Sequence, residues 1–211
     1  MTDYPPTGCL DLDPLSADAR YALLSFARAA DEVFRFWAPY RDHQFTVTMF
    51  RATAPDSARL IPETPFRSLA LAVRLVFQQS EKGAFVNVVN LLRAHAPNAF
   101  TPDLVKVQAH WDSALNGKGN LVYQTNERSY NPREVFETWL YANSFHQDPK
   151  KQPDLAALRT FEPTTSLTLQ LVVCQLAIAT INLDAIVRYL TGRAARDLDN
   201  PPREEVAFGF I

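Results

Sequence analysis

The segment from Ser166 to Leu183 contains 18 consecutive residues without a charged side chain. Apolar residues recur at helical spacings over the longer stretch from about Thr165 to Leu190, where they cover most of the helix circumference. A helix that is apolar nearly all round lies at the centre of a bundle, at a subunit interface or in a membrane. Because polar residues interrupt this stretch and Asp184 and Arg188 follow on the same helix, we expect the buried helix of a soluble bundle rather than a membrane span.

Three further helices share one start signal, in which a side chain that can cap a helix precedes proline at the first helical position. The three pairs are Thr64-Pro65, Thr101-Pro102 and Asn131-Pro132. Glu134 follows Asn131 at the spacing of a capping box, in which each side chain accepts a hydrogen bond from the other residue's backbone N–H. The chain is therefore expected to form helices after each of these pairs.

Other helices are expected from Ala17 to about Tyr40, with Ser16 as the N-cap, and from Ser80 to about His95, either broken or continuous at Gly83. Together these patterns predict a mainly α-helical fold, a single helical bundle of about six or seven helices with a small β element. The expected organisation is an irregular leader (residues 1–15), the bundle domain (16–193) and a tail (194–211).

The small β element is predicted from two segments, residues 44–50 and 120–125. In the first, Phe45, Val47 and Met49 alternate with polar residues, which is typical of a half-buried strand. A lone strand leaves its backbone groups unpaired, so it needs a partner. The second segment follows a Gly-Lys-Gly turn and is the expected partner, in a hairpin or ribbon.

Charge and motifs exclude several classes of function. The net charge of −2 carries no electrostatic signature of nucleic-acid or anionic-lipid binding. The chain has no phosphate-binding loop, no Cys/His zinc spacing and no Gly-x-Ser-x-Gly elbow, so no cofactor and no metal is expected. Cys9 and Cys174 cannot form a disulfide framework, and the first residues do not resemble a signal peptide. A cytoplasmic location, without a membrane partner, is expected.

Two polar side chains on an apolar helix face are the candidate site residues. His146 continues a helical stripe that contains Val135 and Trp139, and Asn143 continues the neighbouring stripe. An imidazole and an amide in such surroundings need hydrogen-bond partners. They are either a structural pair in the core or a site, in which His146 acts as an acid/base or as a ligand-binding or metal-binding group.

The pattern from Trp139 to Lys151, Trp-Leu-x-x-Asn-x-Phe-His-x-Asp-x-x-Lys, resembles one found in bacterial HEPN-like helical proteins. The resemblance covers the last third of the chain. It implies a helical bundle, often dimeric, that belongs to a bacterial defence or toxin–antitoxin system. Active members cleave RNA without metal through an Arg and a His separated by four to six residues. This sequence departs from that motif, because Arg133 lies 13 residues before His146 and Asn143 occupies the nearer polar position.

The resulting expectation is a non-enzymatic interaction or ligand-binding module on a HEPN-like bundle. One alternative is a metal-independent endoribonuclease, with His146 as the acid/base, Asn143 as its orienting group and a cation from Lys150, Arg133 or a second subunit. The other alternative is a structural component of a phage-related or defence assembly. The expected partner is a second copy of the chain in a homodimer, with a different protein or RNA as further possibilities.

Overall fold

The computed structural model describes residues 5–53, 64–78, 82–116, 123–124, 129–143 and 167–192. These residues are mainly α-helical, as the sequence predicts. The elements are α1 (Ala17–Thr53), α2 (Thr64–Phe77), α3 (Phe85–His95), the 3-10 helix η2 (Asn98–Phe100), α4 (Thr101–Asn116), β1 (Tyr123–Gln124), β2 (Ser129–Tyr130), α5 (Pro132–Asn143) and α7 (Leu167–Thr191).

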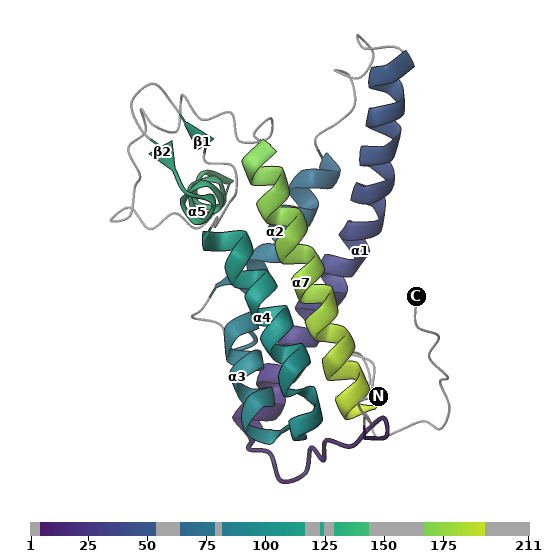
Figure 1. Ribbon diagram of the computed structural model, residues 1–211, viewed down its shortest axis with the longest axis vertical. Helices are drawn as coiled ribbons and strands as arrows, with labels where there is room; N and C mark the ends of the chain where they lie inside the picture. Colours follow the sequence, from purple (N-terminus) through teal and green to yellow (C-terminus); the bar gives the residue numbers. More distant parts are fainter. Residues whose placement is uncertain are drawn as a thin grey trace.

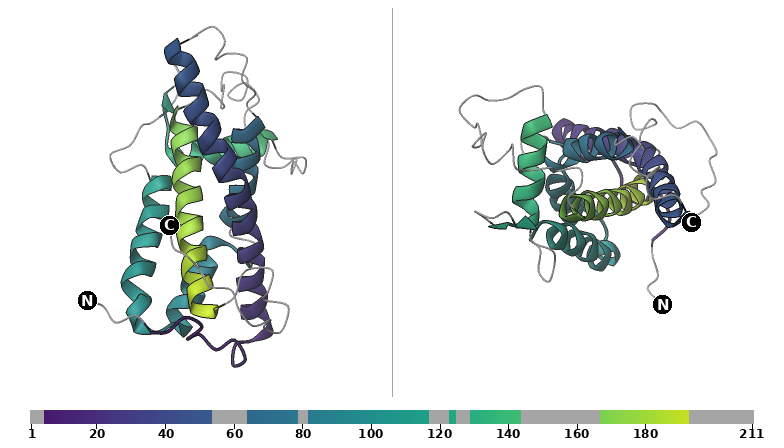
Figure 2. Two further views of the ribbon diagram at one scale, coloured as in Figure 1. Left: turned by 90° about the vertical axis from the view of Figure 1, so that its right-hand side faces the viewer. Right: turned by 90° about the horizontal axis from the view of Figure 1, so that it is seen from above.

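Helix α7 is the helix around which the others pack. It contacts α1, α2, α4 and α5, and Figures 1 and 2 show these four helices on different sides of it. Its residues at helical spacing are fully buried, among them Leu169, Val173, Leu176 and Leu183. By length and composition alone, the Leu169–Thr191 part of α7 could cross a membrane. About half of this apolar stretch is buried inside the protein. The buried half is the face that packs against the other helices.

Two of the predicted caps, at Ser16 and Asn131, are confirmed, whereas Thr64 and Thr101 are the first residues of α2 and α4, and Thr101 itself has helical backbone angles. The Ser16 hydroxyl accepts a hydrogen bond from the Ala19 N–H at 3.2 Å, which caps α1. At the start of α5, the Glu134 N–H donates to Asn131 Oδ1 at 2.9 Å and the Asn131 N–H donates to Glu134 Oε2 at 3.0 Å. This reciprocal pair is the predicted capping box.

The predicted N-cap Ser80 lies outside the described residues. Of the two predicted forms of this helix, the one continuous through Gly83 is wrong, because Lys82 and Gly83 form a turn and α3 begins at Phe85, with Ala84 as an N-cap that makes no side-chain cap hydrogen bond. The chain first passes very close to α1 at Gly83. A Cβ atom on Gly83 would lie 2.7 Å from the Phe26 backbone nitrogen and 2.8 Å from Ser25 Cβ. Helix α3 therefore starts only after this crossing, which needs glycine for its lack of a side chain.

The predicted β element is also wrong. Residues 44–50 belong to α1, which continues past Pro39 to Thr53. Phe45 and Met49 are one helical turn apart as well as on one side of a strand, so their pattern fits both structures. A helix pairs its backbone groups internally, whereas a strand at 44–50 would need a partner. Tyr123 and Gln124, from the predicted partner segment, pair instead with Ser129–Tyr130 in a two-residue antiparallel ladder.

Aromatic side chains pack the helices around α7 against one another. Phe85 of α3 stacks on Trp111 of α4, with ring centroids 4.0 Å apart and planes at 6°. Trp139 of α5 contacts Phe66 of α2 edge-on, with ring centroids 6.0 Å apart. The predicted apolar face of α5 is confirmed, since its residues are buried, namely Val135, Phe136, Trp139 and Leu140.

The leader is bound to the end of α7. From Pro5 to Leu15 it contains turns and bends. The Gly8 and Leu10 N–H groups donate hydrogen bonds to the Tyr189 and Leu190 carbonyls, each at 2.8 Å. Gly192 follows with a φ of +64°, the left-handed conformation that glycine commonly adopts just after a helix. The leader thus satisfies carbonyls that the end of a helix leaves free.

Candidate functional site

The predicted site lies at the edge of the described residues. Asn143 is the last residue of α5, and its side chain is not described. His146 and Lys150 fall outside the described residues, so the pairing of His146 with Asn143 stays a prediction. Arg133, the other predicted source of a cation, lies in the first turn of α5, where its guanidinium is 3.8 Å from Glu137 and 5.8 Å from the centre of the Phe77 ring.

A cleft of about 700 Å³ opens between α1 and the C-terminal end of α2. Its volume lies within the range of small-molecule sites. Most of its charged side chains already have partners, since Lys82 lies 2.6 Å from Asp18 and Glu32 lies 3.1 Å from Arg35. The lining residues include Tyr21, Ser25, Arg28, Asp31, Leu75 and Lys82. A charged ligand would have to compete with these ion pairs.

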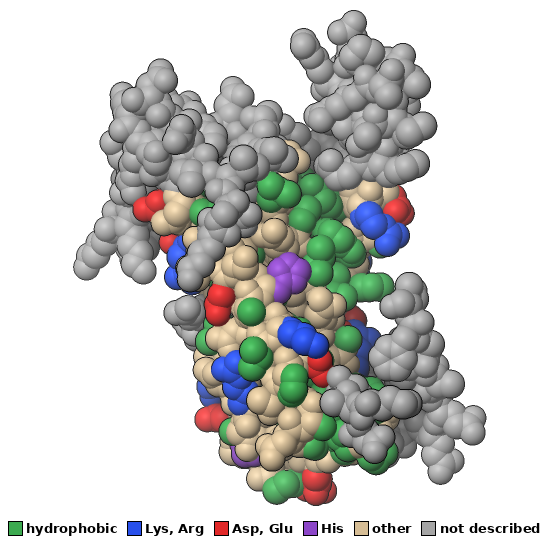
Figure 3. All heavy atoms as spheres, viewed as in Figure 1, with side chains coloured by type: hydrophobic (Ala, Val, Ile, Leu, Met, Phe, Trp, Pro, Cys, Tyr) green, Lys and Arg blue, Asp and Glu red, His purple; other side chains and the backbone are tan. Residues whose placement is uncertain are grey.

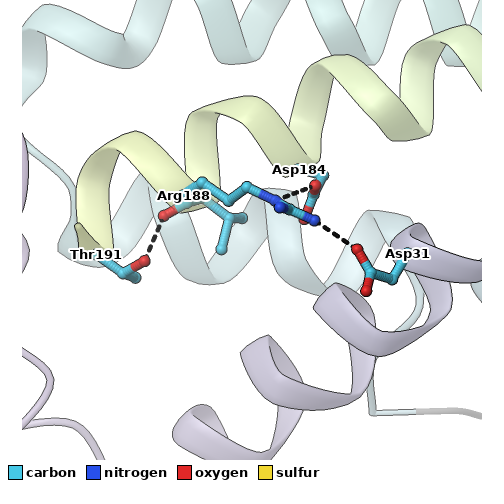
Figure 4. A network of polar contacts seen from close by, with 5 residues as sticks. Asp31, Asp184, Arg188 and Thr191 are labelled. Carbon is cyan, nitrogen blue, oxygen red and sulfur yellow. Dashed lines mark hydrogen bonds and ion pairs between the residues drawn. The ribbon is translucent and has the colours of Figure 1, made fainter. Parts of the chain in front are cut away.

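A network of three charged side chains starts from one wall of this cleft (Figure 4). Arg188 of α7 donates from Nε to Asp184 Oδ2 at 2.6 Å, one turn earlier on the same helix. Its Nη2 donates to Asp31 Oδ1 of α1 at 2.7 Å. Asp31 lines the cleft, whereas Asp184 is only 8% exposed. The guanidinium therefore joins an acid at the surface to an acid in the core.

Burial governs the ionisation of this network. Loss of hydration raises the pKa of Asp184 to about 6, because the neighbouring Arg188 favours the charged carboxylate but does not compensate for burial, and Asp31 raises it further. Burial opposes the charge of Arg188, yet the two carboxylates raise its pKa overall. Asp184 Oδ1 has no hydrogen-bond partner among the described residues.

The burial and the raised pKa of Asp184 determine what chemistry the network can perform. A carboxyl with a pKa of about 6 changes charge close to neutral pH, as an acid/base group does. Asp184 is nevertheless buried, and Arg188 contacts both its Oδ2 and the cleft residue Asp31. The network is therefore an ionic contact between α1 and α7, called here the joint, and its net charge depends on pH. Its buried carboxyl is not exposed to a substrate. Sequence reasoning found Asp184 and Arg188 but assigned them no role.

A second polar contact between these helices involves Cys174 of α7 and Tyr40 of α1. Burial raises the pKa of the Cys174 thiol, although its hydrogen bond with Tyr40 lowers it in part. Burial, and then the interaction with Cys174, raises the pKa of the Tyr40 phenol. Cys174 packs against the core and Cys9 is also a free thiol. Since the thiolate is the reactive form, Cys174 is a packing residue at pH 7.

One face of α7 remains partly open to solvent. Its apolar residues follow a spacing of three and four, namely Leu171, Cys174, Ile178, Ile181 and Ala185, called here the α7 stripe. Leu171 is 41% exposed, Ala185 is exposed and the three residues between them are half-buried. On α1, Phe34 is 57% exposed and lies one turn beyond Asp31, which contacts Arg188. Figure 3 shows hydrophobic side chains gathered over this region of α7 and α1.

No cluster of three or more His, Cys, Asp or Glu side chains suited to a metal ion occurs among the described residues. Comparisons with protein-family models, with curated proteins and with solved structures gave no match to this chain.

Proposed function

We propose that this protein is a non-enzymatic interaction module that pairs with a second copy of itself through the α7 stripe. The observation that carries the proposal is the half-exposed apolar stripe on the most apolar helix of the fold. The same proposal includes three further points: the protein belongs to the HEPN-like bundles, it acts in a bacterial defence or toxin–antitoxin system, and it is cytoplasmic. They are supported by the sequence pattern from Trp139 to Lys151 and by the mainly helical fold.

The spacing of the α7 stripe is suited to a second copy of the same helix. The five residues of the α7 stripe are separated alternately by three and four positions, which is the spacing of the residues that meet between two paired helices. The most common protein dimers bring the same patch of both subunits together across a two-fold axis. An apolar stripe without charges can meet its own copy in this way without burying an unpaired charge.

Leu171→Glu is expected to convert a dimer at micromolar concentration into a monomer. The substitution places a carboxylate on an exposed position of the α7 stripe, where pairing would bury it without a cation. The dissociation constant should rise by more than about tenfold, which corresponds to about 1.4 kcal/mol. Analytical ultracentrifugation between about 1 and 100 µM measures this change, and far-UV circular dichroism verifies that the variant is folded.

Leu75→Glu is the matched control, because Leu75 is 48% exposed on α2 and is not part of the α7 stripe. It should leave the dimer intact. A wild-type protein that is monomeric over the whole range, or a Leu171→Glu variant that dimerises like the wild type, would contradict the proposed pairing. An equal loss of pairing in both variants would place the interface elsewhere.

His146→Ala separates the interaction module from the ribonuclease alternative. We expect wild-type protein to leave structured RNA intact from pH 5 to 8 without added metal. The substitution should lower the free energy of unfolding by about 1–3 kcal/mol, because it removes one partner of the His146–Asn143 pair that the sequence predicts. Denaturant unfolding and gel assays of RNA cleavage measure the two quantities. Metal-independent cleavage by the wild type that disappears in His146→Ala would establish the ribonuclease instead.

A further inference from the structure

Two carboxylates from two helices share one guanidinium in the joint between α1 and α7. Arg188 Nε is 2.6 Å from Asp184 Oδ2, and Nη2 of the same side chain is 2.7 Å from Asp31 Oδ1. The joint therefore holds two negative charges and one positive charge when both acids are ionised. The Asp31 side chain is about half exposed, whereas that of Asp184 is 11% exposed. Water can compensate for the charge of Asp31 but hardly for that of Asp184.

We propose that Asp184, Arg188 and Asp31 form a pH-dependent switch between α7 and α1, in which Asp184 takes up a proton and Arg188 is left with Asp31 as its one ionic partner among the described residues. At high pH, Arg188 is tied both to its own helix and to α1. After protonation of Asp184 the ionic contact across the two helices remains and the contact within α7 becomes a weaker, neutral one. This inference is independent of self-association through the α7 stripe.

The geometry identifies the atom that accepts the proton. Asp184 Oδ2 already accepts the hydrogen bond from Arg188 Nε. Oδ1 of the same carboxyl is buried and has no hydrogen-bond partner in the part of the chain that the structure describes. A buried, unpaired carboxylate oxygen is unfavourable, and a proton on it removes the charge that makes it so.

The charged surroundings of Asp184 fit this assignment. Among the described residues, the charged groups that act on Asp184 are Arg188 on its own helix and Asp31 on α1; none comes from α2, α4 or α5, which also contact α7. Burial is the main reason that the pKa of Asp184 is about 6, compared with 3.8 for a hydrated aspartate, with Arg188 lowering it and Asp31 raising it. The group therefore titrates within the physiological range.

The sign of the effect on stability follows from proton binding. Between pH 3.8 and about 6 the folded protein holds a proton on Asp184 that the unfolded chain has released. Folding is therefore favoured by this group at acidic pH, and the advantage decreases as the pH rises towards about 6. Above that pH the ionised, buried carboxylate destabilises the fold by a constant amount. Acid thus strengthens the fold at this position instead of weakening it.

The test compares wild type with Asp184→Asn, which has the shape of protonated aspartate and does not titrate. The folding equilibrium constant of the wild type, divided by that of the variant, should fall about tenfold from pH 5 to pH 7.5 and become constant above about pH 6. Denaturant unfolding at each pH measures the ratio. Asp13→Asn, a change at an exposed position of the leader, should give a ratio that stays constant over this range.

Carbon-13 resonances of the Asp184 carboxyl and the nitrogen-15 resonance of Arg188 Nε give a second readout in the wild-type protein. Both should titrate with the same midpoint near pH 6. Because Asp31 raises the pKa of Asp184, Asp31→Asn should move this midpoint to lower pH. A carboxyl that titrates below pH 4.5, an Arg188 Nε resonance that does not change, or a stability ratio constant within twofold would overturn the switch.

Discussion

Leu176→Ala is expected to lower the free energy of unfolding by about 2–5 kcal/mol, the range for a leucine deleted from a close-packed core. Leu176 is 0% exposed and lies midway along α7, the helix that contacts α1, α2, α4 and α5. Several helices would have to move together to fill the space that the side chain leaves. Urea unfolding monitored by circular dichroism measures the change.

Leu75→Ala is the matched control for this experiment. It removes the same atoms from α2 at a position that is 48% exposed, so its cost should stay below about 1 kcal/mol. Ile178→Ala should fall between the two, because Ile178 is half-buried in the α7 stripe. Equal costs for Leu176→Ala and Leu75→Ala would mean that α7 is a peripheral helix.

Phe85→Ala is the second change with a large expected effect, a loss of about 3–5 kcal/mol. Phe85 is fully buried at the start of α3 and stacks on Trp111 of α4. The substitution removes this stacked contact as well as the buried apolar surface, and α3 has no side-chain cap to stabilise its start. Thermal unfolding gives the stability, and near-UV circular dichroism reports the altered surroundings of Trp111.

Phe34→Ala provides the comparison at the opposite extreme of burial. Phe34 is 57% exposed on α1, and the monomer should lose less than about 1 kcal/mol when it is truncated. Measurements at submicromolar concentration keep self-association out of the comparison. A Phe85→Ala variant as stable as Phe34→Ala would show that the α3–α4 contact contributes little to the fold.

Local patterns in the sequence were sufficient for much of the fold. Ser16, Asn131 and Glu134 cap their helices as predicted, because a cap depends on residues a few positions apart. The strand predicted at 44–50 is wrong because alternation over a few residues fits a helical turn equally well. The structure decides between a continuous and a broken helix at Gly83: α3 begins only at Phe85, because Gly83 must first pass α1, a contact between segments far apart in the sequence.

The candidate site shows the same division between local and distant contacts. The pairing of Asp184 with Arg188 follows from their spacing of four residues on one helix. The contact of Arg188 with Asp31 joins positions 157 residues apart, and no pattern in the sequence specifies it. Likewise, the apolar run in α7 predicts a largely buried helix, but only its packing shows that Leu171 and Ala185 are left exposed.

The hydrogen bonds between the leader and the end of α7 can form only late in the synthesis of the chain. Gly8 and Leu10 leave the ribosome some 180 residues before their partners, the carbonyls of Tyr189 and Leu190, are translated. Helix α7 also supplies contacts for α1, α2, α4 and α5. The apolar faces of the earlier helices therefore stay exposed to solvent until α7 has been translated. Nascent chains stalled before this helix should bind chaperones and resist proteases poorly, and release of the complete α7 should end both properties.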